Sequence, residues 1–250
     1  MTDAHCHTVR GGAVRRFLCD PCGAAETCPG DVRFFGTHPW RAAEFNASAL
    51  CAALEGNPHA GVGEIGLDRL HSREISREMR GAFEAQLEIA ARYGRPVVLH
   101  GAKCWGETAK AAKRYAGAIP AFLFHAFSRS AGLLAEIESI GGFVSVGPAI
   151  LNPRAENYRA MLKEIPLRML LAESDATEET PEDAPGAAET CAALAALRGI
   201  ATEEMEALLD ANAARFVSSL VDLRGGKCQT SAMLGGSGSG PAEETAPEER

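Results

Sequence analysis

Eight short apolar runs, most of them followed by an amphipathic stretch, constrain the fold of this 250-residue chain most strongly. Several runs are nearly continuous in Val, Ile, Leu and Phe, which is typical of parallel strands that are buried on both faces. In chain order the runs are TDAHCH, AVRRFLC, VRFFGTHP, AGVGEIGL, RPVVLHG, AFLFHAF, GGFVSVGP and RMLLAESDA. Strands that alternate with helices predict an α/β fold with a parallel sheet, and eight of them predict a (β/α)8 barrel of the TIM type.

The stretches between these runs predict helices. The clearest covers residues 75–93, where Met79, Phe83 and Leu87 share one helical stripe and Gly94 provides a stop. Further helices are expected at 48–55 (with Ser48 as N-cap), 106–116, 130–140, 156–164, 186–198 and 202–221. The segments RGGAVRR and DPCGAAETCPGD have the composition of loops, so the first two crossovers are expected to be abbreviated and the barrel short and somewhat irregular.

Composition changes near the end of the chain. From about Gly225 the sequence is rich in Gly, Ser, Pro and Glu and lacks apolar periodicity, so we expect a barrel domain over 1–223 and a disordered tail over 224–250. The formal net charge is −8, and the last ten residues supply four glutamates against one arginine. The mild acidity of the remainder disfavours non-specific binding of nucleic acid, although bound divalent cations would reverse the sign locally.

The sequence predicts a soluble, cytoplasmic monomer. No window approaches the roughly 18 apolar residues of a membrane helix, and the start of the chain lacks the pattern of a signal peptide. A reducing compartment disfavours disulfides among the eight cysteines. Cys19, Cys22 and Cys28 form a C-x2-C-x5-C run, but no paired fourth ligand accompanies them. We interpret them as free thiols in a loop rather than as a zinc site.

Residue types that bind metal ions or act as acids and bases lie at the ends of most of the predicted strands. In a parallel barrel the carboxyl ends of all strands meet on one face, and this face hosts the active site. A single histidine there is more often a hydrogen-bonded structural residue, but five of the seven histidines share this position. His59 and His71 follow no strand and are interpreted as surface residues. The strand-end residues are His5, His7, His38, Glu64, His100, His125 and Asp175.

The opening stretch, DAHCHT, adds a geometric argument. Alternate residues of a strand point to the same side, so His5 and His7 point into the barrel while Cys6 packs outward as a core residue. Four or five histidines with two carboxylates exceed the needs of one tetrahedral ion and favour a pair of divalent cations. Glu64, on a central strand between two glycines, is the best candidate for a bridging ligand.

These motifs, taken in order, resemble those of the TatD family of metal-dependent deoxyribonucleases, within the amidohydrolase-like barrels. The GEIGLD run with the later histidines is more specific than the opening D-x-H-x-H, which indicates only the wider superfamily. The resemblance covers roughly residues 3–218, in the stretches DAHCH, GTHPW, GVGEIGLD, FEAQLEIAARYGRPVVLH, FHAFS, GGFVSVGPAI, LLAESDA and NAARF.

The resemblance implies two divalent metal ions, with Mg2+ expected and Zn2+ or Mn2+ as alternatives. It implies that Asp175 positions or deprotonates the attacking water and that His38 contacts the scissile phosphate. The substrate it implies is DNA, as single strands or 3′ ends. The implied ligands are His5, His7, Glu64 and Asp175 for one ion, and Glu64, His100 and His125 for the other.

The sequence departs from the family at positions that would contact substrate. Ala102 stands where family members commonly carry an arginine, and the adjacent Lys103 is a candidate phosphate contact that lacks the arginine fork. After Asp175 the chain reads ATEETPEDA instead of proline and an aromatic residue, and four acidic residues there would repel a polynucleotide: Glu178, Glu179, Glu182 and Asp183. Trp40 and Trp105 are the evident platforms for stacking bases.

Three hypotheses remain open at this point. The first is a metal-dependent nuclease that hydrolyses phosphodiester bonds at DNA ends. The second keeps the metal centre but acts on a small phosphoester, amide or aminoacyl ester. The third is a barrel without catalysis that retains metals for structure or binds a partner through its tail, which the complete ligand set with Asp175 disfavours. The fold does not separate the first two, because barrels of this kind support many chemistries.

Overall fold

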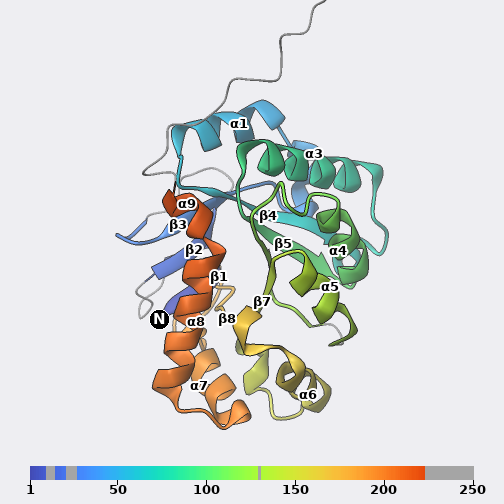
Figure 1. Ribbon diagram of the computed structural model, residues 1–250. Helices are drawn as coiled ribbons and strands as arrows, with labels where there is room; N and C mark the ends of the chain where they lie inside the picture. The colour runs from blue at the N-terminus through green and yellow to red at the C-terminus, as the bar shows by residue number, and fades with distance from the viewer. Residues whose placement is uncertain (10–14, 21–26, 129–130, 223–250) are drawn as a thin grey trace, which may run out of the picture.

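The computed structural model describes residues 1–9, 15–20, 27–128 and 131–222, and its strands form one parallel eight-stranded sheet in chain order (Figure 1). The strands are β1 (Thr2–Cys6), β2 (Arg15–Cys19), β3 (Val32–Phe35), β4 (Gly61–Asp68), β5 (Val97–Ala102), β6 (Phe122–Phe124), β7 (Gly142–Val146) and β8 (Leu170–Ala172). Each predicted apolar run overlaps one strand. The predicted (β/α)8 barrel is therefore confirmed.

Backbone hydrogen bonds draw the first strand to the segment that follows the last. The N–H of Asp175 donates to the carbonyl of His5 (3.0 Å), and the N–H of His7 donates to the carbonyl of Ala176 (2.8 Å). The sheet thereby becomes a nearly closed barrel, and Asp175 is fixed beside the histidines of β1.

Helices surround the barrel. The α-helices are α1 (Ala47–Gly56), α2 (Arg69–Ser72), α3 (Arg77–Tyr93), α4 (Trp105–Lys113), α5 (Leu134–Ser139), α6 (Glu156–Glu164), α7 (Ala187–Arg198), α8 (Thr202–Phe216) and α9 (Ser218–Asp222). Short 3-10 turns are η1 (Pro39–Glu44), η2 (Ala131–Leu133), η3 (Pro148–Leu151) and η4 (Leu167–Met169). Helix α3 packs on β4, α4 on β4 and β5, α5 on β7, and α7 and α8 on β1 and β8. None of these helices is long and apolar enough to cross a membrane.

The start of the chain is held in place, as predicted from its opening motif. The Met1 ammonium group lies 2.8 Å from the carboxylate of Glu206 on α8. The N–H of Thr2 donates to Asp210 on the same helix (2.6 Å). Strand β1 is thus anchored at the end opposite to its histidines.

Several predicted helix boundaries were wrong. Helix α1 begins at Ala47, and its N-cap is Asn46 instead of Ser48, because the Asn46 side chain accepts the N–H of Ala49 (3.0 Å). The helix predicted from residue 75 begins at Arg77, since the Ser76 hydroxyl caps it.

The other end of α3 was predicted correctly, and Gly94 ends it in the left-handed conformation with φ of 60°. The single helix predicted over 202–221 is instead α8 and α9, because Val217 (φ −98°, ψ 9°) leaves helical geometry. The predicted domain boundary, the tail over 224–250 and most of the predicted loops before β2 and β3 lie outside the described residues.

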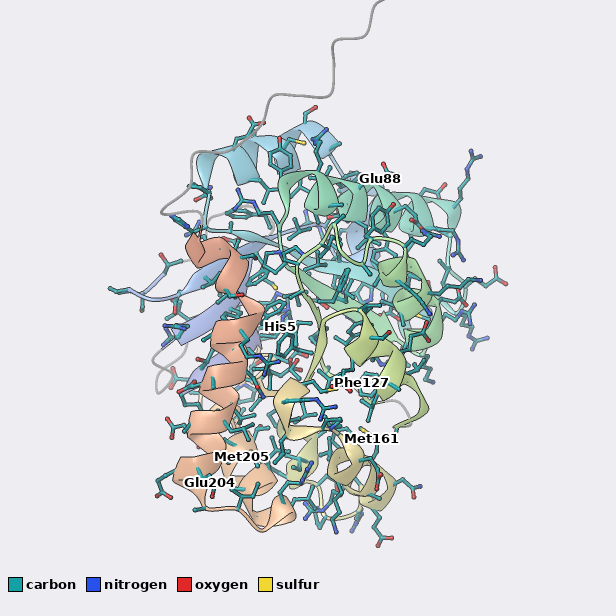
Figure 2. The ribbon with its side chains drawn as sticks, viewed as in Figure 1. His5, Glu88, Phe127, Met161, Glu204 and Met205 are labelled. Atoms are coloured by element: carbon teal, nitrogen blue, oxygen red, sulfur yellow. The ribbon has the colours of Figure 1, made fainter. Side chains whose placement is uncertain are left out.

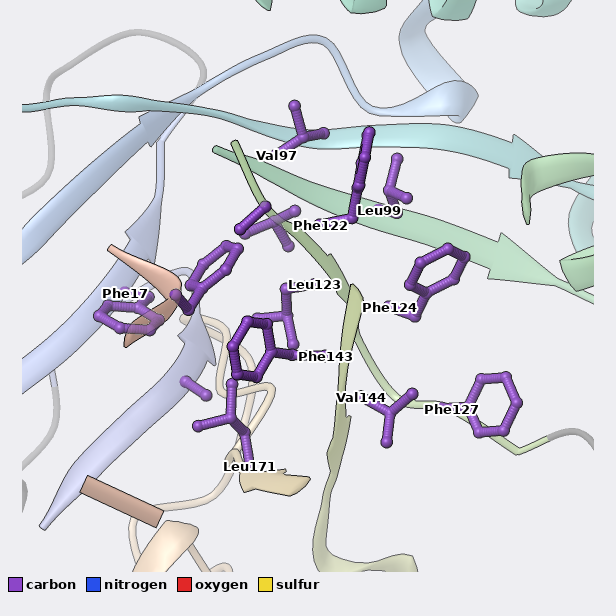
Figure 3. Packing of buried hydrophobic residues seen from close by; sticks show 14 of the residues in the cluster. Phe17, Val97, Leu99, Phe122, Leu123, Phe124, Phe127, Phe143, Val144 and Leu171 are labelled. Carbon is purple, nitrogen blue, oxygen red and sulfur yellow. The ribbon is translucent and has the colours of Figure 1, made fainter. Parts of the chain in front are cut away.

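Aromatic side chains fill the barrel below the strand ends that carry the histidines. Phe216, from the end of α8, stacks on Phe34 with ring centroids 5.7 Å apart, and also contacts Phe17 and Phe143. In Figure 3, Phe17, Leu123, Phe143 and Leu171 gather on one side of β6 and β7, with Phe124 and Phe127 on the other. This alternation separates the barrel interior from the layer beneath the helices.

We expect Phe216→Ala to lower the free energy of unfolding by about 3–5 kcal/mol, because it leaves a cavity among three buried rings. Urea denaturation of the metal-free protein would measure the change. The control is Leu70→Ala, which truncates an exposed side chain and should change stability by less than about 0.5 kcal/mol. A loss below about 1 kcal/mol for Phe216→Ala would contradict this packing.

Candidate metal centre

The structure gathers the predicted strand-end residues around the buried carboxylate of Glu64, on β4. Its Oε1 atom lies 2.6 Å from Nδ1 of His100 and 2.7 Å from Nε2 of His125. Its Oε2 atom lies 3.2 Å from Nε2 of His7 and 3.4 Å from Nε2 of His5. Figure 2 shows His5 near the middle of the molecule, between the strands. One carboxylate therefore faces two pairs of imidazoles.

Two further predicted residues lie at the edge of this cluster. His38 presents Nε2 at 3.5 Å from Glu64 Oε1. Asp175 presents Oδ1 at 3.4 Å from His5 Nε2 and 3.8 Å from His7 Nε2, and its side chain is 45% exposed. Asp175 is therefore the carboxylate of the cluster that solvent and substrate can reach.

The backbone geometry at two positions makes this arrangement possible. Asp175 adopts φ of 52°, a left-handed conformation that Asp tolerates better than most residues. At Gly66 a Cβ atom would lie 2.0 Å from the carbonyl oxygen of His100. Only glycine therefore lets β4 approach β5 closely enough to bring Glu64 and His100 together.

The donor atoms fit a divalent cation. Three groups of side chains each place three donor atoms within 4.8 Å of one another, and they share members: His5, Glu64 and His125; His5, His7 and Asp175; His38, Glu64 and His100. Imidazole nitrogens with carboxylate oxygens suit Zn2+ and related transition metals. The sharing of Glu64 between groups suits a centre of more than one ion.

The charges of the metal-free cluster also favour the binding of a cation. Burial alone disfavours the charged form of both Glu64 and His125, but their mutual attraction outweighs it. The pKa of Glu64 is held well below its ordinary value, with hydrogen bonds from His100 and His125 contributing. The pKa of His125 is raised to about 10. Protons therefore occupy the metal-free cluster, at positions where a cation would supply the same positive charge.

Comparison with known proteins agrees with this geometry. Residues 23–218 match the family model described as TatD related DNase. The chain belongs to the TatD family.

Individual relatives support the assignment. The 3'-5' ssDNA/RNA exonuclease TatD of Edwardsiella piscicida is 31% identical over 152 residues, which are 59% of this chain and 58% of that protein. The uncharacterized metal-dependent hydrolase YjjV of Escherichia coli is 32% identical over 149 residues, 57% of each chain. The matched segments thus span less than two thirds of the length of these two curated relatives.

Solved structures of the TatD family have the same fold. The crystal structure of the Escherichia coli homologue YjjV has a TM-score of 0.74 at 25% identity and covers 86% of this chain and 97% of that chain. A TatD family hydrolase from Entamoeba histolytica has a TM-score of 0.68 at 16% identity and covers 82% of this chain and 85% of that chain. The second likeness concerns the fold alone.

Three residues that support the histidines of this TatD-family centre were missed by sequence reasoning. The first is Asp68, at the end of β4, whose Oδ2 atom lies 2.9 Å from Nε2 of His100 and accepts the indole N–H of Trp40 (2.7 Å). A carboxylate in this position fixes the orientation and tautomer of a metal-facing histidine. Asp68 is the last letter of the motif GVGEIGLD, so the motif itself contained the signal.

The second is Cys19, which lies buried at the end of β2 with Sγ 3.4 Å from Nδ1 of His5. Its carbonyl oxygen is 3.2 Å from Nδ1 of His7 and accepts that N–H, which leaves Nε2 free to face the cluster. The interpretation of Cys19 as a loop thiol was therefore wrong, because β2 extends to it. Cys28 is an exposed thiol, and Cys22 lies outside the described residues. Cys6 packs outward, as predicted.

The third is Glu173, fully buried behind His125, with Oε1 at 3.6 Å from the Nδ1 atom of that histidine. Its carboxylate accepts hydrogen bonds from the Ala126 N–H (2.7 Å) and the Ser145 hydroxyl. Glu173 directly follows β8 and stands in the motif LLAESDA, so the motif contained this residue without marking its role.

His38 differs from the other histidines in its hydrogen bonding. Its Nδ1 atom accepts the backbone N–H of Trp40 (3.2 Å), so the ring proton of the neutral form is on Nε2. Burial lowers the pKa of His38, which favours that neutral form. His38 therefore faces the cluster with an N–H donor instead of a lone pair, and it can donate to an oxygen of a bound substrate.

The remaining predicted residues have mixed outcomes. Trp105 is no stacking platform, because its ring is buried over Gly101 and against Phe124 and Phe127. Trp40 is 58% exposed.

Lys103 follows β5 and is exposed, and its contact with phosphate remains a prediction. His59 and His71 are exposed, as predicted.

Two cavities adjoin the cluster. A cavity of about 950 Å³ is bordered by Asp175, Tyr158, Met161 and Pro148. A smaller one of about 240 Å³ is bordered by His7, His38 and Glu64. The four acidic residues that follow Asp175 are all exposed. Two of them, Glu178 and Glu182, border a neighbouring cavity that shares Ser174 and Thr180 with the first.

We expect Asp68→Asn to weaken the binding of divalent metal by about 10- to 100-fold, because His100 loses its anionic partner. Competition against a metallochromic indicator would measure the affinity. Glu204→Gln removes one exposed negative charge on α8 and serves as the control. Unchanged affinity in Asp68→Asn would show that His100 does not depend on Asp68.

We also expect metal binding at pH 7 to release about one proton from His125, since a pKa of about 10 leaves it protonated in the metal-free protein. Affinity should therefore fall as the pH is lowered. Calorimetric titration in two buffers of different ionisation enthalpy measures the release, with the exposed histidine variant His59→Ala as control. Heats that do not depend on the buffer would contradict the protonated cluster.

Proposed function

We propose that this TatD-family hydrolase is a divalent-metal-dependent phosphodiesterase that removes nucleotides from the ends of single-stranded DNA, with 3′ ends as its main substrate. The observation that carries the proposal is Glu64, whose two oxygens face two different pairs of histidines. Such a carboxylate suits a bridge between two ions, the arrangement used to cleave phosphodiesters. The name of the Edwardsiella piscicida relative, a 3'-5' ssDNA/RNA exonuclease, supports the choice of substrate.

The residues that would hold the ions follow from the geometry. His5, His7, Glu64 and Asp175 would hold one, and Glu64, His100 and His125 the other. When bound, the ions would supply positive charge that acidifies water and neutralises the phosphodiester. Although Mg2+ is the expectation from the family resemblance, a donor set with four imidazoles favours Zn2+ or Mn2+.

The side chains of the chain itself would perform three tasks. Asp175 accepts the proton of the attacking water: although burial raises its pKa, the hydrogen bond and charge of His5 keep that pKa below its ordinary value. The water oxygen bonds to phosphorus as the P–O bond to the leaving group breaks. The Nε2–H group of His38 donates a hydrogen bond to a non-bridging phosphate oxygen. Asp68, Glu173 and Cys19 hold the histidines in place.

A small phosphoester, amide or aminoacyl ester is the second candidate substrate, and a specific observation favours it. The exposed acidic residues Glu178, Glu179, Glu182 and Asp183 follow Asp175 directly. They would repel the backbone of a long polynucleotide. The cavity of about 950 Å³ beside Asp175 has the size of a small-molecule site.

Degradation of end-labelled single-stranded DNA tests the proposal. We expect shortening with Mn2+, Zn2+ or Mg2+ and none in EDTA. Asp175→Asn should reduce the rate by about 10²- to 10⁴-fold, the usual contribution of a general base, and Glu64→Ala should abolish activity together with metal binding. The control is Glu204→Gln, on the part of α8 that Figure 2 shows well away from His5.

Two outcomes would contradict the proposal. Shortening that persists in EDTA would show that the cluster is not responsible for it. No shortening with any of these metals, together with metal-dependent hydrolysis of a small ester or amide, would replace the nuclease with the second candidate.

A further inference from the structure

A row of four rings leads from the protein surface to Glu64. The exposed ring of His71, on α2, stacks on Trp40 with centroids 4.6 Å apart and an angle of 24°. Trp40 meets His38 edge to face at 4.7 Å, and His38 meets His100 in the same manner at 4.7 Å. His100 in turn lies 2.6 Å from Glu64.

The buried carboxylate of Asp68 fixes both ends of this row. Its Oδ1 atom accepts the backbone N–H groups of Leu70 and His71 (2.6 and 2.8 Å), which caps α2, the helix that carries His71. Its Oδ2 atom accepts the indole N–H of Trp40 (2.7 Å) and lies 2.9 Å from His100 Nε2. The exposed rings therefore have a fixed position relative to the cluster.

The exposure of Trp40 is unusual for this protein. In the part of the chain that the structure describes, the exposed large apolar side chains are Trp40 (58%), Leu70 (64%) and Leu151 (39%). The indole N–H of Trp40 is satisfied inside the protein by Asp68, so what remains in solvent is ring surface. Exposed aromatic surface held rigidly beside a site is typical of a binding surface.

We propose that Trp40 and His71 form a stacking subsite for a planar ring of the substrate, joined covalently to the ester bond that is hydrolysed at the Glu64 cluster. This subsite rests on the proposed hydrolytic function and defines its substrate class as an ester that carries a nucleobase or a comparable aromatic ring. Stacking tolerates any base, because every base has a π-face. Trp40 then contributes to substrate binding, and the metal-facing residues contribute to the chemistry.

Steady-state kinetics on a matched pair of single-stranded oligonucleotides tests the subsite. One oligonucleotide carries bases throughout, and the other is identical but lacks the bases of its last 3′ nucleotides. We expect Trp40→Ala to raise KM about ten- to hundredfold on the first, with little change in kcat, and His71→Ala to have a smaller effect in the same direction. On the abasic oligonucleotide, Trp40→Ala and the unaltered protein should have equal KM.

Two further variants separate stacking from a structural role. Trp40→Phe keeps a ring but loses the N–H that Asp68 accepts, so its KM should lie between those of Trp40 and Trp40→Ala. Leu151→Ala removes another exposed apolar side chain and should leave KM unchanged. The subsite is refuted if Trp40→Phe and Trp40→Ala both lose metal affinity and lose kcat equally on the two oligonucleotides. Trp40 would then act only through Asp68.

A binding measurement that needs no turnover distinguishes this inference from the nuclease proposal. With Mg2+ present, thymidine 5′-monophosphate should quench the tryptophan fluorescence of the protein, ribose 5-phosphate should not, and Trp40→Phe should show no quenching. Quenching by the nucleotide in a protein that degrades no DNA would reject the nuclease and keep the subsite. Quenching by phenyl phosphate alone would assign the subsite to a small aryl ester. No quenching by either ring would overturn the inference.

Discussion

The attraction between one buried carboxylate, Glu64, and the histidines around it organises the functional end of this barrel. Burying that charge is costly unless opposite charge compensates it, and the imidazole of His125 provides this at 2.7 Å from Oε1. Nδ1 of His100 lies 2.6 Å from the same oxygen. The same attraction raises the pKa of His125 to about 10, so the metal-free cluster binds protons. A site built in this way holds positive charge, whether protons or metal ions supply it.

The barrel brings together residues that are far apart in the chain. Hydrogen bonds from Asp175 and His7 join the ends of the sheet, so the first and the last strand contribute side chains to one cluster. The close approach of β4 to β5 at Gly66 also brings His100, on β5, to the cluster. The outer end of the site differs in character, because Trp40 offers ring surface on one side while exposed acidic residues follow Asp175 on the other.

The sequence predicted the strands and the residues of the cluster because parallel strands end on one face, and that rule needs no knowledge of packing. It did not predict Asp68 or Glu173, since their importance depends on which nitrogen of a histidine they face. The prediction for Trp105 was wrong because the burial of its ring depends on Gly101, the fifth residue of β5, where a side chain would occupy the space of the indole. Likewise, the choice of Asn46 over Ser48 as a helix cap depends on local backbone angles.

The anomalous scattering of crystals loaded with Mn2+ tests the central claim most directly. We predict two peaks, one on each side of Glu64, about 3.5–4 Å apart, with one carboxylate oxygen of Glu64 facing each peak. His5 and His7 should lie beside one peak, and His100 and His125 beside the other. A single peak, or peaks that do not contact Glu64, would contradict the assignment of this carboxylate as the bridge of a two-metal centre.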